Sequence, residues 1–220
     1  MPQLIDLSHT IEAGMITYKG LPAPLMCDFL SREASRKHYD CGHEFLIGKI
    51  ELVGNTGTYL DSPFHRYADG KDLSELPLEK LAELDAVVVR RPHAAGLATD
   101  EADLRGLDVK GKAVLVHTGW DEHWRTDRYF ENHPFLTEAA AHFLVNAGAR
   151  LVGIDSHNID DTRRRTRPVH TVLLGAEIPI CEHMCNLAAV PDGCFRFHAV
   201  PPKLKAFGTF PVRAFAVVPD

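Results

Sequence analysis

A helical pattern that leads straight into an apolar strand does most to restrict the fold of this chain. Residues 137–147 place their apolar side chains on one stripe at helical spacing, and Gly148 follows as a typical helix stop. Residues 151–155 come next as an apolar run of strand length. A helix that feeds directly into a buried strand is typical of α/β proteins. We therefore predict a mixed α/β fold.

Other apolar or β-branched segments predict further strands of the sheet. No internal repeat or linker separates them, and 220 residues suffice to bury a core, so we predict one domain over residues 1–220. The other strands that we expect lie at 5–10, 45–53, 86–90, 113–117, 169–174, 178–180, 194–199 and 210–218.

The composition argues against several classes of protein. A formal net charge of −6 with no basic half argues against a nucleic-acid partner, which requires a positive surface. No apolar run approaches the roughly 20 residues that span a bilayer, and no secretory signal is visible, so we expect a cytoplasmic protein without a membrane partner. The five cysteines are an odd number at irregular spacing, which argues against a disulfide framework and a structural zinc site.

Residues 54–66 hold the strongest candidate for a functional site. If the strand expected at 45–53 is buried and continues, alternate side chains share one face. Pro63 has no amide hydrogen, so the strand should end near Asp61 and bring His65 back over its end. A carboxylate and an imidazole then lie side by side. The residues expected to share their face are Asn55, Gly57 and Tyr59.

This stretch resembles the signature of the metal-dependent cyclase family, which includes bacterial kynurenine formamidases and isatin hydrolase. The signature is His-x-Gly-Thr-His-x-Asp-x-Pro-x-His. Asn55 and Tyr59 stand in place of its first two histidines, whereas Asp61 and His65 match its aspartate and its last histidine. The resemblance implies a cyclase-like swivelling β/β/α fold with a mixed sheet. It also implies that the aspartate is a metal ligand and the last histidine an acid/base.

A second segment resembles the part of the family that supplies a ligand histidine and a ligand glutamate, and here these positions are His170 and Glu182. The resemblance implies one divalent metal, zinc or manganese, held by these two residues and Asp61. One histidine, two carboxylates and water form an acceptable coordination set for either ion. Each residue also has a structural interpretation: a turn cap for Asp61, a core histidine for His170 and a surface carboxylate for Glu182.

The family resemblance implies a hydrolase that acts on a carbon–nitrogen bond of a small amide, formamide or cyclic amide. His65 is the expected general base, and Tyr59 is the expected hydrogen-bond donor to the oxyanion. Asn55 and Trp120 are expected to bind substrate. Two alternatives stay open: a metal-free small-molecule binding protein or catalytically silent relative, and a lyase or isomerase that uses His65 as a base.

Two loops have less specific interpretations. Residues 120–134 are rich in aromatic side chains, which indicates a lid, a subunit contact or a loop packed on its own aromatics. Family members are commonly homo-oligomers, so a dimer or tetramer is implied, with this loop as the candidate contact. Residues 156–168 carry several aspartates and arginines, which indicates a solvated or subunit-bridging loop, or an arginine that binds an anion.

Overall fold

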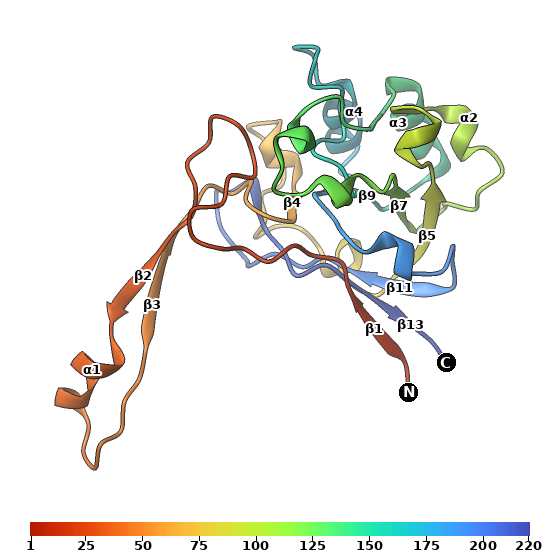
Figure 1. Cartoon of the computed structure of the whole chain (residues 1–220). Coiled ribbons are helices and arrows are strands. Elements are labelled where there is room, and N and C mark those ends of the chain that lie inside the picture. Colours follow the sequence, from red (N-terminus) through yellow and green to blue (C-terminus); the bar gives the residue numbers. More distant parts are fainter.

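The computed structural model describes all 220 residues and places nine strands in one mixed sheet (Figure 1). Their spatial order is β1-β13-β11-β5-β7-β9-β10-β4-β12. This sheet confirms the predicted α/β class, whereas a single domain over residues 1–220 stays a prediction. The strands are β1 (Gln3–Asp6), β4 (Tyr59–Asp61), β5 (Leu84–Arg90), β7 (Ala113–His117), β9 (Leu151–Ile154), β10 (Ile180–Glu182), β11 (Phe195–His198), β12 (Thr209–Pro211) and β13 (Phe215–Val218). A two-residue pair, β6 (Ala98–Thr99) and β8 (Phe135–Leu136), lies outside this sheet.

The sheet is parallel in its middle and antiparallel toward both edges. Strands β5, β7, β9 and β10 run parallel to one another, and all other pairings in the sheet are antiparallel. Helices α2 (Glu101–Leu104), α3 (Glu138–Ala147) and α4 (Pro168–Gly175) lie together on one side of it (Figure 1). Alternate residues of β7 belong to two different apolar clusters, of 18 and 22 buried residues. The central sheet is therefore covered on both faces.

Helix α3 confirms the expected helix at 137–147 to within one residue. The hydroxyl of Thr137 accepts a hydrogen bond from the amide of Ala140 at 3.2 Å and caps the first turn. Gly148 ends the helix in the left-handed conformation, at φ 79°. Strand β9 follows at once, as expected. None of the helices is long and apolar enough to cross a membrane.

Helix α4 occupies a segment that the sequence predicts as a strand, and that prediction is wrong. Pro168 lies at the start of the helix, where a proline loses no hydrogen bond. The carboxylate of Asp160 accepts hydrogen bonds from the amides of Val169 and His170, at 2.8 and 3.1 Å. These bonds satisfy two of the free donors of the first helical turn. A short apolar run does not by itself distinguish a buried helix from a strand.

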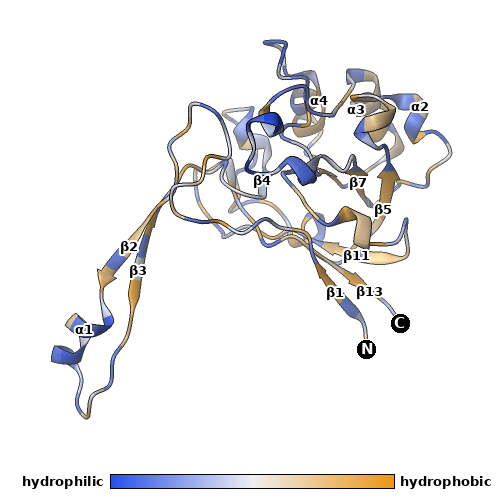
Figure 2. Ribbon diagram, in the orientation of Figure 1, coloured by the Kyte–Doolittle hydropathy of each residue, from blue (hydrophilic) through white to orange (hydrophobic).

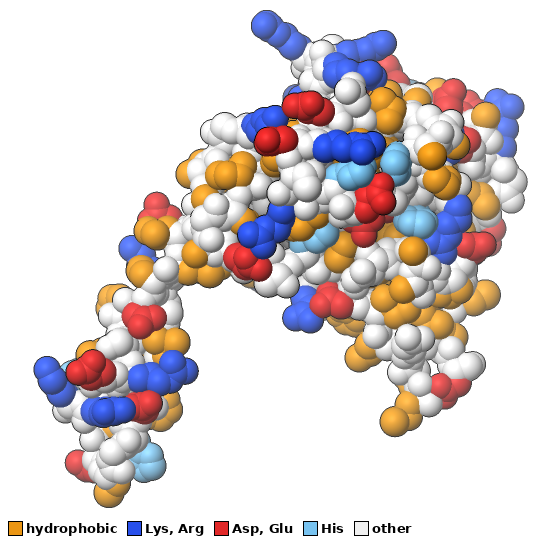
Figure 3. Space-filling model, viewed as in Figure 1, with side chains coloured by type: hydrophobic (Ala, Val, Ile, Leu, Met, Phe, Trp, Pro, Cys, Tyr) orange, Lys and Arg blue, Asp and Glu red, His pale blue; other side chains and the backbone are white.

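Residues 25–51 form an arm that projects away from the rest of the chain (Figure 1). It consists of β2 (Leu25–Leu30), the short helix α1 (Arg32–Ser35) and β3 (Ile47–Glu51). The sequence predicts a buried strand at 45–53, and this is wrong because every residue of β3 is exposed. Hydrophobic segments are visible along both strands (Figure 2), and hydrophobic side chains lie among charged ones on the surface of the arm (Figure 3). The exposed apolar side chains of the arm are Leu25, Met26, Phe29, Tyr39, Phe45, Leu46, Ile47 and Ile50.

The aromatic loop at 120–134 packs partly on itself and partly on histidines of other segments, among them His9, which stacks on Trp124. Trp120 and Tyr129 are 3% and 1% exposed. The indole nitrogen of Trp120 donates a hydrogen bond to the carbonyl of Tyr129 at 3.0 Å, and Trp124 packs edge-on against Tyr129. The two most buried aromatic side chains of the loop are thus held inside the same chain.

Candidate active site

Three adjacent strands bring most of the predicted site residues together. Strand β4 pairs with β10 on one side and with β12 on the other. The register places Tyr59 opposite Glu182 and Asp61 opposite Thr209. Side chains of directly opposed residues lie on the same face of a sheet and within contact distance. The register of the sheet therefore creates two polar pairs beside each other.

Strand β4 ends at Asp61, as the sequence predicts, and the short 3-10 segment Pro63–His65 follows it. Residues 54–58 form bends, so the expectation that Asn55 shares a strand face with Asp61 is wrong. Gly57 explains the difference, because its φ of 65° is incompatible with an extended strand. Asn55 nevertheless lines the cavity, described below, onto which His65, His170 and Glu182 also open.

Asp61 is completely buried, and its two carboxylate oxygens have different surroundings. Oδ1 accepts a hydrogen bond from the hydroxyl of Thr209. Oδ2 has no hydrogen-bond partner and lies 3.7 Å from Nε2 of His170. Burial opposes ionisation of Asp61, but His65, His170 and Thr209 outweigh burial and lower its pKa. A buried anionic oxygen without a partner is costly unless a cation lies beside it.

His170 presents one ring nitrogen to this carboxylate. Its Nδ1 lies 2.6 Å from Oδ2 of Asp160, which fixes the ring and turns Nε2 toward Asp61 and Glu182. A carboxylate behind a histidine is the usual arrangement at protein metal sites, because it sets the tautomer and raises the basicity of the ligand nitrogen. Burial lowers the pKa of His170, but attraction to Glu182 and the bond to Asp160 raise it to about 10 overall.

Glu182 is buried and held by two hydrogen bonds. Oε2 accepts from the hydroxyl of Tyr59 at 2.5 Å, and Oε1 accepts from the amide of Ile159 at 2.6 Å. Oε1 also lies 3.7 Å from Nε2 of His170. Burial raises the pKa of Glu182 to about 7, although His170 opposes the shift. Burial and the charge of Glu182 raise the pKa of Tyr59 well above its usual value, so the phenol keeps its proton.

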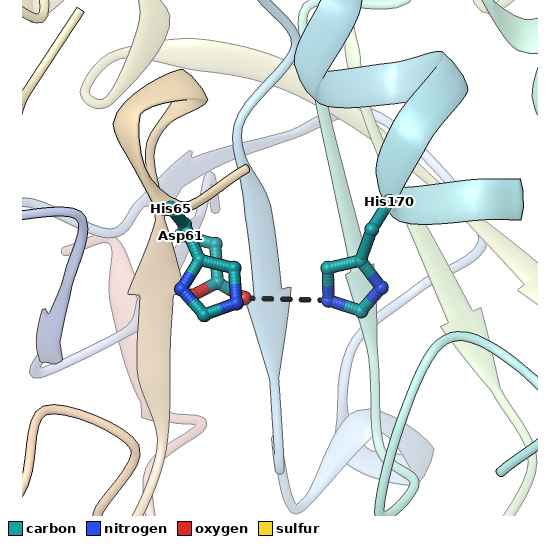
Figure 4. A group of neighbouring side chains, drawn as sticks. All are labelled: Asp61, His65 and His170. Atoms are coloured by element: carbon teal, nitrogen blue, oxygen red, sulfur yellow. Dashed lines mark ion pairs between the residues drawn. The ribbon is translucent and has the colours of Figure 1, made fainter. Parts of the chain in front are cut away.

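His65 lies at the mouth of the site with a defined tautomer. Its Nδ1 lies 2.7 Å from the hydroxyl of Thr209, which already donates its only hydrogen to Asp61. The hydroxyl must therefore accept a hydrogen from Nδ1, and neutral His65 keeps a lone pair on Nε2. Figure 4 shows the rings of His65 and His170 facing one another, with 5.9 Å between their centres. Gly208 permits this geometry, because a Cβ there would lie 2.6 Å from the backbone nitrogen of His65.

These side chains open into a cavity of about 450 Å³. Five of the seven residues predicted for the site line it: Asn55, Tyr59, His65, His170 and Glu182. Asp61 lies behind them, within 4 Å of both histidines. The structure does not bring Trp120 into this cavity, because its ring is packed inside the loop described above. The other residues of the lining are Tyr18, Lys19, Gly20, Leu21, Arg66, Asn158 and Arg167.

Two residues that the sequence does not identify hold the site residues in place. Asp160 orients His170, and Thr209 links Asp61 to His65. Asp160 carries one local signal, since it precedes a proline-initiated helix whose first amides need an acceptor. Thr209 carries none, because it reaches Asp61 only through the pairing of β12 with β4.

The site residues fit one divalent metal ion. Ligand atoms of Asp61, His65 and His170 all lie within 4.8 Å of one another. The free Oδ2 of Asp61 and the free Nε2 of His170 are a hard oxygen and an imidazole nitrogen, which suit zinc and manganese. Glu182 can join through Oε1, which lies as close to His170 as Asp61 does. The positions of Asn55 and Tyr59 supply no imidazole, so a second metal lacks ligands here.

The mixed sheet carries a cavity beside β4 and β10 that is lined by histidine and carboxylate side chains. These features place the chain among the α/β proteins with a candidate metal centre. A family model described as putative cyclase matches residues 5–161. Kynurenine formamidase from Geobacillus thermodenitrificans is 31% identical over 172 residues, which is 76% of this chain and 78% of that protein. Kynurenine formamidase from Bacillus cereus is 27% identical over 96% of this chain and 95% of its own. The chain belongs to the putative cyclase family, which confirms the resemblance.

Solved structures show the same fold. A structure described as a potential metal-dependent hydrolase with cyclase activity has a TM-score of 0.80 at 24% identity, with full coverage of both chains. Isatin hydrolase A from Labrenzia aggregata has a TM-score of 0.84 at 20% identity, over 100% of this chain and 94% of its own. These similarities confirm the predicted cyclase-like fold.

Proposed function

We propose that this chain is a metal-dependent hydrolase that cleaves the carbon–nitrogen bond of a small amide, formamide or cyclic amide. One observation carries the proposal: the unpartnered, buried Oδ2 of Asp61 faces Nε2 of His170, whose other nitrogen is fixed by Asp160. The relatives named kynurenine formamidase support the reaction class. The expected location in the cytoplasm stays a prediction.

The proposed metal ligands are Asp61, His170 and Glu182, and the ion is zinc or manganese. When bound, such an ion polarises a carbonyl and lowers the pKa of water. The protein prepares the ligands in advance, since Asp160 fixes His170 while Tyr59 and Ile159 fix Glu182. Ligands that are already oriented lose little freedom when the ion binds.

His65 is the proposed general base. Its free Nε2 accepts the proton of the attacking water and passes it to the leaving nitrogen. Thr209 keeps the opposite nitrogen protonated, so the ring presents the basic atom to the cavity. Asn55 lines the cavity and is the proposed contact to substrate. The oxyanion role of Tyr59 stays a prediction, and it requires the hydroxyl to turn away from Glu182.

The rim of the cavity indicates which amides to test. Lys19, Arg66 and Arg167 all line it. Arg66 bonds to the hydroxyl of Thr171, and Arg167 bonds to backbone carbonyls and lies beside the phenol of Tyr18, so neither guanidinium has a carboxylate partner. Two unpaired guanidinium groups beside one cavity favour a ligand that carries a negative charge. We therefore propose that the substrate has a carboxylate remote from the scissile amide.

A paired substrate screen tests the function. Small N-formyl and N-acyl amides and cyclic amides that carry a carboxylate are compared with their neutral methyl esters, with zinc or manganese added. We expect hydrolysis of at least one carboxylate-bearing compound, faster than that of its ester. Analysis of the products as an acid and an amine, with one water consumed, separates hydrolysis from lyase or isomerase chemistry. Failure of every compound with metal bound contradicts this substrate class.

A metal-free binding protein is the second candidate. A protonated His170 carries a positive charge that can replace the charge of a metal ion among the carboxylates of the site. At a pKa of about 10 its ring is an imidazolium in the absence of metal, with Asp61, Asp160 and Glu182 around it. This charge balance lets the site exist without an ion. Elemental analysis of the parent and of Asp61→Ala protein, both purified without added metal, distinguishes the two candidates, because only metal that Asp61→Ala loses belongs to this site.

Metal affinity at the proposed site should rise with pH. A coordinating imidazole must be deprotonated at the ligand nitrogen, so an ion must displace the proton of His170. Because that pKa is about 10 in the metal-free site, protons compete at every pH below it. We expect apparent zinc affinity to rise by up to about tenfold per pH unit from pH 6 to 9. Competition with a chelator of known protonation measures this, and a flat profile contradicts coordination by Nε2 of His170.

The proposed homo-oligomer, a dimer or tetramer, forms through the arm rather than through the loop at 120–134. No other part of the chain covers the exposed apolar side chains of β2 and β3. An isolated two-stranded hairpin is marginally stable in water, so a second copy of the chain is the proposed cover. Sedimentation equilibrium should show a dimer or larger, and the double variant Phe29→Ser with Ile50→Ser should be a monomer. Lys49→Ser on the same strand is the matched control, and a monomeric parent protein contradicts the proposal.

A further inference from the structure

A second group of metal-ligating side chains lies beyond the ends of two parallel strands. His93 follows β5 in the 3-10 segment His93–Ala95, and its amide donates to the carbonyl of Thr118 just after β7. Glu122 and His123 lie in the 3-10 segment that opens the aromatic loop. None of these three side chains lines the cavity of the candidate active site. They gather at the carboxyl ends of parallel strands, where α/β proteins commonly bind ligands.

The three ligand atoms already have nearly the spacing that a metal ion imposes. Oε1 of Glu122 lies 3.0 Å from Nε2 of His93 and 3.3 Å from Nε2 of His123. All three residues offer ligand atoms within 4.8 Å of one another. In a tetrahedral zinc site with bonds of about 2.0–2.1 Å, neighbouring ligand atoms lie about 3.3 Å apart. The two distances to Glu122 are therefore close to those of a bound ion, and the third pair of ligand atoms lies within 4.8 Å.

The surroundings hold both imidazole rings in place. Trp120 packs edge-on against His93 and His123, with ring centres 5.2 and 4.5 Å away. Nε2 of His123 is buried and has no hydrogen-bond partner, so its ligand atom is free. One positive group opposes a cation, because the guanidinium of Arg128 lies over the ring of Trp120, 5.7 Å from its centre. The carboxylate of Glu122 offsets that charge.

We propose that His93, Glu122 and His123 bind one divalent ion of the zinc class, with water as the fourth ligand. Two imidazoles and one carboxylate favour zinc, cobalt or nickel over magnesium and calcium, which prefer oxygen ligands. The ion joins the aromatic loop to the segment after β5. Its role is structural, because its ligands belong to no part of the catalytic cavity.

Zinc binding to the Asp61→Ala protein tests this site separately from the proposed active site. We expect one zinc per chain in competition with a chelator, and a cobalt spectrum typical of tetrahedral coordination. His93→Ala and His123→Ala in that background should each weaken binding by at least about 100-fold. Glu122→Gln, at an exposed position, should weaken it by about tenfold without disturbing the fold. His142→Ala is the matched control, since His142 pairs with Glu138 on an exposed helix face with no third ligand.

Two results overturn the proposal. One is the absence of stoichiometric zinc in folded Asp61→Ala protein. The other is equal zinc affinity before and after His93→Ala and His123→Ala are combined. If Asp61→Ala does not fold, the same count is made in the parent protein, where His123→Ala must remove one bound zinc. An inactive enzyme with this zinc still bound argues against the proposed function and leaves this site standing.

Discussion

Asp61→Ala is expected to remove the active-site metal and to lower turnover by about 1,000-fold or more. Asp61 supplies the one buried carboxylate oxygen that no other group satisfies, and it also anchors Thr209. Its loss leaves His170 and Glu182 as the only proposed ligands. A 1,000-fold loss equals about 4 kcal/mol of transition-state stabilisation, which is within the range supplied by a catalytic metal. Metal content and kcat/KM measured on the same preparations check both effects.

The isosteric variant Asp61→Asn separates loss of charge from loss of shape. Asparagine can still accept the hydrogen bond of Thr209, so the strands around β4 should keep their pairing. We expect it to lose metal and activity nearly as completely as alanine does, because an amide oxygen is a weaker ligand for zinc. Metal should be counted in the His123→Ala background, so that the second proposed site does not contribute. Full metal content in Asp61→Ala contradicts the assignment of this ligand.

Local signals in the sequence predict the elements that local interactions determine. Helix α3 was predictable because its cap, its apolar stripe and its terminal glycine all lie within 12 residues of one another. The end of β4 was predictable because Pro63 cannot extend a central strand. The family signature adds Asp61 and His65, and the later segment adds His170 and Glu182. The structure brings all four together.

Contacts between distant segments account for what the sequence analysis missed. Thr209 reaches Asp61 across a sheet register that no local pattern encodes. Strand and helix are equally compatible with the apolar run at 169–174, and the cap from Asp160 selects the helix. The run at 45–53 is apolar, as a buried strand is. An apolar pattern does not show whether the segment is covered by its own chain or by another one. The structure places it on the arm, where the proposed cover is another copy of the chain.

His65→Ala is expected to lower turnover by about 100- to 10,000-fold while leaving the active-site metal bound, whereas Asp61→Ala is expected to lose both. That range is the usual contribution of a positioned general base. His65 is 35% exposed, and it reaches Asp61 through Thr209 rather than through the free oxygen. Metal content and kcat against pH, measured together, check the result.

Thr209→Val is the companion variant, because it keeps the imidazole and removes the acceptor that fixes its tautomer. We expect a smaller loss, about 10- to 100-fold. Loss of the metal in His65→Ala contradicts the assignment of His65 as the general base and indicates that His65 is a metal ligand. Because ligand atoms of Asp61, His65 and His170 also lie within 4.8 Å of one another, His65 would then be the third ligand. Glu182, held by Tyr59 and Ile159, would be left as the carboxylate available to accept the proton.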